Sequence, residues 1–164
     1  MDFMIREMKP NEYGELENFL YEAIYIPEGA AKPARKILQR PELQIYVENF
    51  GARASDTCFV AEADKKLVGE CWTRIMNDYG HIDNETPSLA LSVLENFRRK
   101  GIATALLEKI FIKLAEKNFK RVSLSVQKEN LAAVELYRKL NFEVVEERGE
   151  EFLMIKNLEG KNFA

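Results

Sequence analysis

Residues Ser88–Leu107 read SLALSVLENFRRKGIATALL. The apolar run Ser88–Val93 is typical of a buried strand, and a run of basic residues follows it shortly afterwards. From there on, apolar residues recur every four positions, which predicts a helix over Gly101–Lys117. The stretch is therefore expected to form a strand, a basic loop and a helix in direct succession.

The basic loop has the features of a phosphate-binding turn. The first turn of a helix carries unpaired N–H groups and a partial positive charge, and a phosphate can accept hydrogen bonds from those groups. Gly101 and the small Ala103 leave room for an anion to approach the backbone. Arg98, Arg99 and Lys100 add positive charge at the same point. The pattern predicts a pyrophosphate cradle, and a solvated basic loop before an ordinary helix is the alternative.

A second informative stretch reads VSLSVQKENLAAVELYRKLNF and covers residues 122–142. Its periodicity predicts a strand over Arg121–Gln127 and a helix over Leu131–Leu140. Asn130 stands where a helix N-cap is expected. Tyr137 falls on the apolar face of the helix, where an aromatic residue is most often part of the core.

Together the two stretches resemble the signature motifs of the GNAT superfamily of acetyl-CoA-dependent N-acetyltransferases. Arg98-x-x-Gly101-x-Ala103 is similar to the Arg/Gln-x-x-Gly-x-Gly/Ala motif that follows an apolar strand in this family. The second motif comprises an Asn, a helix with Leu-Tyr and a closing Gly-Phe, and it resembles Asn130–Phe142. Asn141 stands in place of the usual Gly, and Asn also tolerates the left-handed conformation required after a helix. The resemblance extends over nearly the whole chain.

The expected architecture is a single N-acetyltransferase domain over residues 1–164, of the α/β class. Strand–helix–strand passages imply parallel pairing at the centre of the sheet, and hairpins imply antiparallel edges, so the sheet is mixed and mostly antiparallel. The resemblance implies that the parallel central pair splays apart, with helices on both faces, as in the acyl-CoA N-acyltransferase fold. The other expected elements are a helix from Pro10 to Ile24 and strands at 3–8, 57–63, 67–76, 144–148 and 151–155.

The resemblance also implies acetyl-CoA as the cosubstrate, bound where the two central strands separate at their C-terminal ends. The backbone N–H of Leu91 would polarise the thioester carbonyl, and Tyr137 would serve as the general acid for the leaving thiolate. No metal is expected. The residues implied in binding the cofactor are Val93, Arg98, Arg99, Lys100, Gly101, Ile102, Ala103, Thr104 and Asn130.

The general base is open at the level of sequence. Many members of the family carry a Glu at the start of the central strand, but this strand starts with Ser88. Glu85 is the preferred candidate, and Asp83 and Glu70 are alternatives. A lysine-like amine has a pKa near 10.4 in water, so it must lose a proton before it attacks. A water relay or an acceptor that arrives deprotonated would serve instead of a direct base.

The expected function is transfer of the acetyl group to a primary amine of a small molecule or peptide by direct attack. The alternative is a CoA-binding regulatory or interaction module with impaired catalysis, which Ser88 favours and Tyr137 opposes. Among relatives in the family, homodimers are common, so a homodimer is possible.

Composition excludes several other classes. The 164 residues carry 24 Lys and Arg against 27 Asp and Glu, so the net charge of −3 does not favour a nucleic-acid partner. The longest uncharged segment, Thr86–Leu94, is too short for a membrane helix of about 20 residues. No basic and then apolar leader is visible at the N-terminus, so a cytoplasmic protein is expected.

The two cysteines, Cys58 and Cys71, are too few for a disulfide scaffold and fit a reducing compartment. They fall on the two strands of a predicted hairpin. A two-residue turn at Asp64-Lys65 predicts that they face each other across it.

Overall fold

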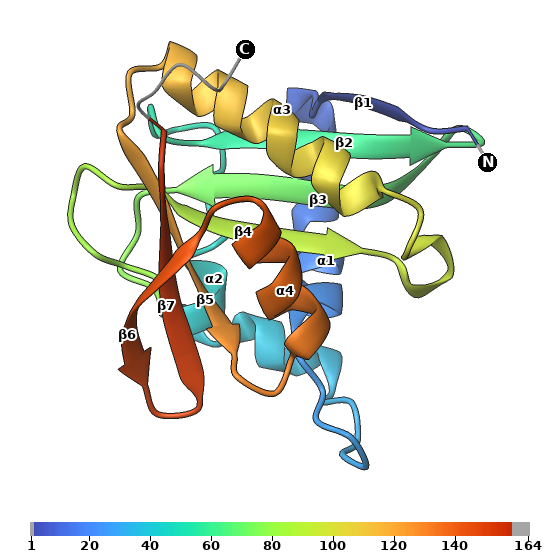
Figure 1. The fold of residues 1–164 in the computed structure, drawn as a ribbon. Helices are drawn as coiled ribbons and strands as arrows, with labels where there is room; N and C mark the ends of the chain where they lie inside the picture. Colours follow the sequence, from blue (N-terminus) through green and yellow to red (C-terminus); the bar gives the residue numbers. More distant parts are fainter. Residues whose placement is uncertain (1, 159–164) are drawn as a thin grey trace.

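The computed structural model describes residues 2–158, which form a seven-stranded sheet in the order β1-β2-β3-β4-β5-β7-β6 (Figure 1). The strands are β1 (Met4–Glu7), β2 (Thr57–Ala63), β3 (Lys66–Arg74), β4 (Ser88–Val93), β5 (Arg121–Gln127), β6 (Glu143–Arg148) and β7 (Glu151–Asn157). The α-helices are α1 (Leu16–Ala23), α2 (Pro41–Gln44), α3 (Ile102–Glu116) and α4 (Leu131–Lys139). Shorter 3-10 helices cover Pro10–Glu15, Arg35–Gln39 and Glu95–Phe97.

The sheet is mixed, as the sequence predicts. Within residues 2–158, neighbouring strands run antiparallel except for β4 and β5, which are parallel. These two strands pair at a single position, Ser88 with Ser123, in the part of the chain that is described. The expected splayed parallel pair is therefore confirmed, and it opens toward the C-terminal ends of both strands.

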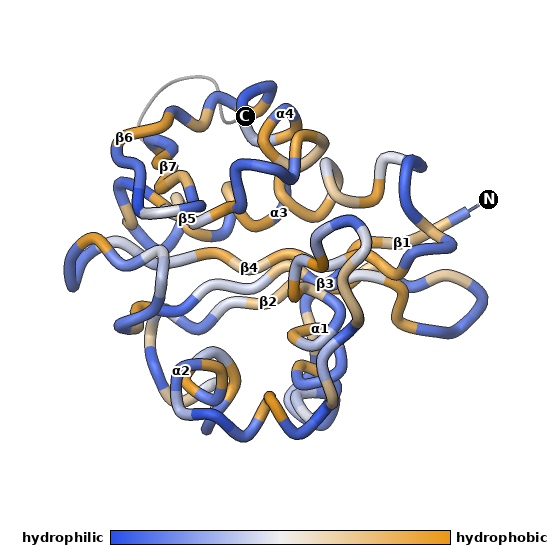
Figure 2. The backbone as a smooth tube through the Cα atoms, turned by 90° about the horizontal axis from the view of Figure 1, so that it is seen from below, coloured by the Kyte–Doolittle hydropathy of each residue, from blue (hydrophilic) through white to orange (hydrophobic). Residues whose placement is uncertain are grey.

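The helices lie on both faces of the sheet, which also confirms the expected fold class. Figure 2 shows α3 and α4 over one face and α1 and α2 over the other. The longer helix, α3, packs its buried apolar side chains against β2 and β3. They are Ile102, Leu106, Leu107, Ile110, Phe111 and Leu114. Gly69 on β3 allows this close approach, because a Cβ there would lie 3.3 Å from side-chain atoms of Ile102 and Leu106. None of the helices described in residues 2–158 is long and apolar enough to cross a bilayer.

The helix expected from Pro10 to Ile24 forms in two parts. Its first six residues, Pro10–Glu15, wind as a 3-10 helix, and the α-helix proper begins at Leu16. The buried side chains of this helix, Leu16, Phe19 and Leu20, belong to a separate apolar cluster beneath the sheet. That cluster also includes Trp72 of β3.

The prediction that the two cysteines face each other is wrong. The β2–β3 register shifts by one residue between Ala61 and Glu62, so Cys58 stands opposite Trp72 rather than Cys71. A shift of one residue turns every later side chain to the other face of the sheet. Cys58 is consequently buried on the α1 side and Cys71 on the α3 side.

Candidate functional site

The gap between β4 and β5 exposes a row of backbone groups. The hydrogen bond from the Leu94 N–H to the Val68 carbonyl, 2.9 Å, sets the phase of the β3–β4 ladder. Residues of an antiparallel ladder alternate between bonding to the neighbour and pointing away from it. Leu91 and Val93 fall in the second group, so their N–H and C=O groups point away from β3 and into the gap. An extended ligand can add to β4 along this edge.

The turn before α3 has the geometry that the sequence predicts for an anion cradle. Gly101 is the N-cap of α3 with φ +83°, and no side chain caps the helix. A Cβ on Gly101 would meet no atom within 4 Å, so open space lies in front of the helix. Arg99 also adopts a positive φ of 61°. The N–H groups of the first turn, from Ile102 to Thr104, therefore have room for an anion.

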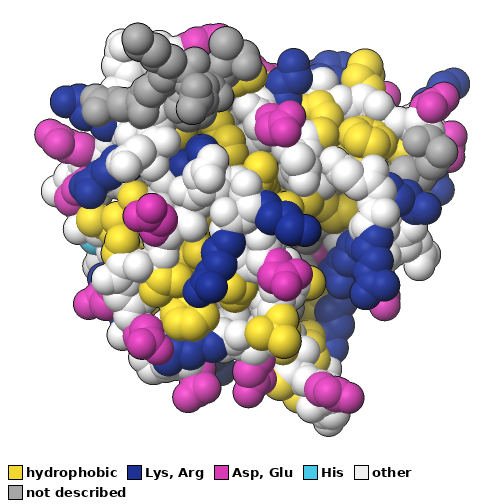
Figure 3. Space-filling view, viewed as in Figure 1, with side chains coloured by type: hydrophobic (Ala, Val, Ile, Leu, Met, Phe, Trp, Pro, Cys, Tyr) yellow, Lys and Arg dark blue, Asp and Glu magenta, His cyan; other side chains and the backbone are white. Residues whose placement is uncertain are grey.

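Positive charge surrounds this turn. Arg98, Arg99 and Lys100 are exposed, and Figure 3 shows Lys and Arg side chains gathered over the loop between β4 and α3. Ile102 differs from them because its side chain is buried in the core, and only its backbone faces the turn. Arg98 has a second role, since its Nε donates to the Val93 carbonyl at 2.9 Å. It thereby ties the loop to the end of β4.

Helix α4 borders the gap on the same side. Asn130 is its N-cap, and the Asn130 side chain accepts a bond from the Ala133 N–H at 3.4 Å. Tyr137, seven residues later, is buried and packs edge-on against Phe142, with ring centroids 5.4 Å apart. Burial, with a smaller effect from Cys71, raises the pKa of Tyr137. Cys71 is the cross-strand neighbour of Leu91, so the Tyr137 ring lies close to the centre of β4.

Two carboxylates lie on the opposite face of the sheet, Asp78 at the closed end of the gap and Glu151 opposite Gln127 near the C-terminal end of β5. Asp78 accepts a bond from the Ser88 hydroxyl at 2.8 Å, and the Tyr46 hydroxyl also bonds to it. Glu151, at the start of β7, bonds to Ser125 on β5. Burial raises the pKa of both carboxyl groups, and the charge of Asp78 further raises that of Glu151. Both are therefore easier to protonate than exposed carboxylates.

The loop that carries Asp78 is held against β5. The Ser123 hydroxyl donates to the Gly80 carbonyl at 2.7 Å, and the Ser123 N–H donates to the Pro87 carbonyl at 3.0 Å. A Cβ on Gly80 would come within 3.2 Å of the Leu124 backbone, which explains why a glycine stands there. The sequence assigns this loop only as polar, and nothing local in it signals that Asp78 reaches the gap.

The acidic residues named from the sequence lie elsewhere. Glu85 is exposed in the loop before β4. Asp83 accepts a bond from Arg121 at 2.6 Å near the start of β5. Glu70 points toward α1, is fully buried, and finds no hydrogen-bond partner for either oxygen among residues 2–158. Ser92, its cross-strand neighbour, also has a buried hydroxyl without a partner there.

The comparison with known proteins agrees with this arrangement. Residues 21–142 match the family model described as Acetyltransferase (GNAT) family, which is more than half of the chain. The protein belongs to the GNAT family.

Individual relatives are similar over part or all of the chain. An N-alpha-acetyltransferase of Saccharolobus solfataricus is 39% identical over 95 residues, which is 53% of this chain and 56% of that protein. The chain thus spans about half the length of such curated relatives. The structure of a PaiA N-acetyltransferase from Thermoplasma acidophilum in complex with coenzyme A has a TM-score of 0.72 at 20% identity, covering 96% of this chain and 99% of that one. A ribosomal-protein-S18-alanine N-acetyltransferase from Escherichia coli scores 0.66 at 16% identity, covering 98% of both chains.

The buried Glu70 makes stability depend on pH. Burial raises its pKa from an ordinary value near 4.5 to about 9. The folded protein therefore holds a proton that the unfolded chain releases, so the free energy of unfolding falls as pH rises between these two values. Glu70→Gln removes the ionisable group, so the free energy of unfolding of the variant should not show this fall with pH. We expect equal melting temperatures for both proteins near pH 4.5, and at about pH 8 a variant more stable by at least about 1 kcal/mol, or roughly 2–4 °C.

The matched control is Glu85→Gln, because Glu85 is exposed. Its melting temperature should differ from that of the wild type by a similar small amount at every pH. A difference between Glu70→Gln and the wild type that does not grow with pH would show that Glu70 is ionised in the folded protein.

Proposed function

We propose that the protein is an N-acetyltransferase that transfers the acetyl group of acetyl-CoA to a primary amine by direct attack. The observation that carries the proposal is the gap between β4 and β5, with backbone groups along one edge and an uncapped helix N-terminus at its mouth. Membership of the family supports the same function. When bound, acetyl-CoA supplies an activated thioester, and the protein orients it.

Acetyl-CoA would be bound both by backbone N–H groups and by positively charged side chains. The N–H groups from Arg99 to Thr104 would hold the pyrophosphate, with the charges of Arg98, Arg99 and Lys100 around them. The Val93 N–H would pair with the pantetheine arm, since its carbonyl already accepts from Arg98. The Leu91 N–H would donate to the thioester oxygen. Asn130 caps α4 through its carbonyl oxygen, so its amide N–H groups are the part proposed to bind the cofactor.

Backbone geometry should dominate over single charges at this site. Gly101→Val places a branched residue at φ +83°, where side chains are strained, and fills the space in front of the helix. Arg99→Ala removes one exposed charge that salt already screens. Calorimetric titration should show a much larger loss of acetyl-CoA affinity for Gly101→Val. Circular dichroism checks that both variants are folded, and a larger loss for Arg99→Ala would assign the site to charge instead.

The acceptor amine is proposed to enter from the α1/α2 face. Asp78 lies there at the closed end of the gap and Glu151 farther along β5, both opposite the face that carries Tyr137. A partly desolvated carboxylate with a raised pKa is a better base than an exposed one. We therefore propose Asp78, directly or through water, in preference to the exposed Glu85.

The base assignment can be tested by Asp78→Asn. Without a base, kcat/KM for the amine should fall about 10²–10⁴-fold, while acetyl-CoA affinity stays the same. In the wild type, kcat/KM should decline as pH falls below the raised pKa of Asp78, because burial favours its protonated form. Glu85→Gln, measured in the same assay, tests the sequence-based candidate. A larger loss for Glu85→Gln would move the role of base to Glu85.

The acceptor class proposed for the first test is a peptide α-amine. Several relatives carry the name N-alpha-acetyltransferase. Chemistry favours the same class, because an α-amino group has a pKa of about 7.7–8.0 and a lysine side chain about 10.4. A weakly basic carboxylate removes the proton of an α-amine with a smaller free-energy penalty.

Thiol release from acetyl-CoA tests the function itself. The panel holds peptides with a free N-terminus, N-blocked peptides with an internal lysine, and a polyamine. We expect turnover with the free N-termini, and a loss of about 10²–10⁴-fold in kcat for Tyr137→Phe with unchanged acetyl-CoA affinity. The ring still packs against Phe142 in that variant, so only the hydroxyl is lost. Acetyl-CoA binding without thiol release for any amine would instead identify a CoA-binding module.

A further inference from the structure

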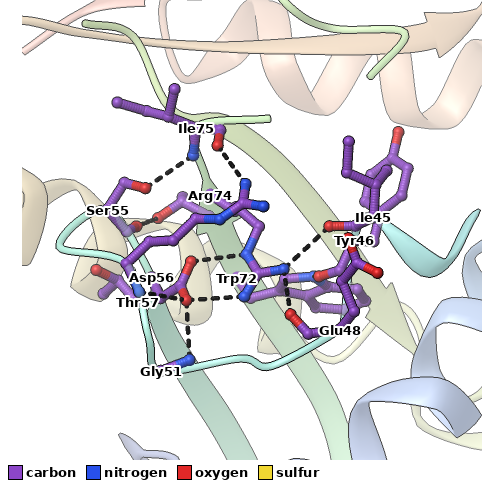
Figure 4. Close-up of polar contacts among 12 residues, drawn as sticks. Ile45, Tyr46, Glu48, Gly51, Ser55, Asp56, Thr57, Trp72, Arg74 and Ile75 are labelled. Carbon is purple, nitrogen blue, oxygen red and sulfur yellow. Dashed lines mark hydrogen bonds and ion pairs between the residues drawn. The ribbon is translucent and has the colours of Figure 1, made fainter. Parts of the chain in front are cut away.

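Arg74, the last residue of β3, is fully buried and paired with an equally buried Asp56 (Figure 4). The guanidinium binds the carboxylate through two bonds, Nε to Oδ1 at 2.8 Å and Nη2 to Oδ2 at 2.9 Å. Its remaining nitrogen, Nη1, donates to the carbonyls of Ile45 and Glu48, at 3.1 Å and 2.6 Å. One side chain thus joins the sheet to the segment that follows α2.

Asp56 binds the later part of the same segment, around Gly51 and Arg53. Its Oδ2 accepts bonds from the Gly51 and Arg53 N–H groups, at 2.8 Å and 3.2 Å. Arg74 holds the pKa of Asp56 below its usual range, although burial acts in the opposite direction. The pair therefore stays charged, and it fixes the irregular chain from 45 to 56 at both ends.

Tyr46 lies between the two carbonyls that Arg74 holds. Its own carbonyl accepts a bond from Trp72 Nε1 at 3.2 Å, so three successive contacts place its backbone beneath the sheet. The buried Tyr46 side chain then reaches Asp78 through its hydroxyl. The result is a continuous set of contacts from Arg74, through the 45–48 backbone and Tyr46, to the carboxylate at the closed end of the gap.

Stability alone does not account for this pair. Removing two charges from water has a large free-energy penalty, and apolar residues of similar volume often stabilise a protein as well or better. A bidentate pair with two further carbonyl contacts does supply directional restraint, because the guanidinium presents its donors in a fixed plane. Position, rather than added stability, is what this arrangement provides.

We propose that Arg74 is a positioning residue for the amine acceptor, which it serves by holding Tyr46 against Asp78. The inference rests on the proposed function, in which Asp78 is the base. The groups that face Asp78 are the Ser88 hydroxyl from β4, the Tyr46 hydroxyl from the segment after α2, and Glu151 from β7, with Tyr79 close to Tyr46. Tyr46 donates a bond that favours the ionised carboxylate, whereas Glu151 disfavours it.

The test is a double-mutant cycle of Arg74→Lys and Tyr46→Phe. A lysine keeps the charge but lacks the planar set of donors, so it loses the carbonyl contacts at Ile45 and Glu48. Each single variant should lower kcat/KM for the amine by about ten- to hundredfold, the value of one hydrogen bond to a charged group. Each should also move the acidic limb of the pH profile to higher pH. The kcat/KM of the double variant should be little lower than that of either single variant, because both substitutions act through the same contact.

The controls separate positioning from folding. Arg6→Lys is the matched substitution, since Arg6 also binds two carboxylates, Glu12 and Glu62, but on β1 away from the gap. It should leave the amine KM and the pH profile unchanged. Acetyl-CoA affinity should be the same in all variants, and thermal unfolding reports whether Arg74→Lys folds.

Carbon-13 NMR titration of Asp78 gives a readout without turnover, and it should show a higher pKa in both single variants. If the wild type acetylates no amine, the proposed function fails while this titration still tests the contact. An unchanged Asp78 titration and unchanged amine kinetics in Tyr46→Phe overturn the proposal even if Arg74→Lys does not fold. Fully additive losses in the double variant overturn it as well.

Discussion

Separation of β4 from β5 beyond the Ser88–Ser123 pair is the constraint on which the rest of the site depends. A buried backbone group without a partner is costly, so strands in a sheet interior ordinarily pair along their length. Here the Leu91 N–H and C=O and the Val93 N–H point toward the gap instead, while the Val93 carbonyl accepts from Arg98. The arrangement is favourable when a ligand with its own amide groups completes the ladder.

The two layers of helices supply opposite electrostatics to that gap. On the α3/α4 side, a helix N-terminus and the cations of residues 98–100 favour an anion. On the α1/α2 side, Asp78 and Glu151 favour a cation or a proton. This division matches an acyl transfer from an anionic cosubstrate to an amine. The overall net charge of −3 does not reveal this separation of positive and negative charge between the two faces.

The protein buries ionisable side chains in two different ways, one with partners and one without partners among residues 2–158. Arg74 and Asp56 pair with each other, and Arg74 also donates to neighbouring carbonyls; the half-buried Lys117 donates to the Asp56 carbonyl at 3.2 Å from the end of α3. Glu70 lacks such partners among residues 2–158, and burial keeps it protonated over the neutral range. The first arrangement holds an irregular loop in place, whereas the second lowers stability as pH rises.

The order of the elements, the mixed sheet and the glycine-containing basic turn before α3 could be predicted from the sequence, because they follow from local periodicity and from residues adjacent in the chain. Gly101 and its basic neighbours are adjacent in the chain, so an anion-binding turn can be predicted there without a structure. The carboxylates on the α1/α2 face could not be predicted in this way. Asp78, Tyr46 and Glu151 come from three distant segments, and only the packing of loop 77–87 against β5 brings them together.

The cysteines show the same limit on a smaller scale. One extra residue on β3, Val68, lies between the partners of Ala61 and Glu62, so Cys58 and Cys71 face opposite sides of the sheet. Strand periodicity predicts alternation within each strand, but register between strands also depends on where a bulge inserts an extra residue. Tertiary packing, not local sequence, therefore decided which side chains face the core layers, and which carboxylates meet at the gap.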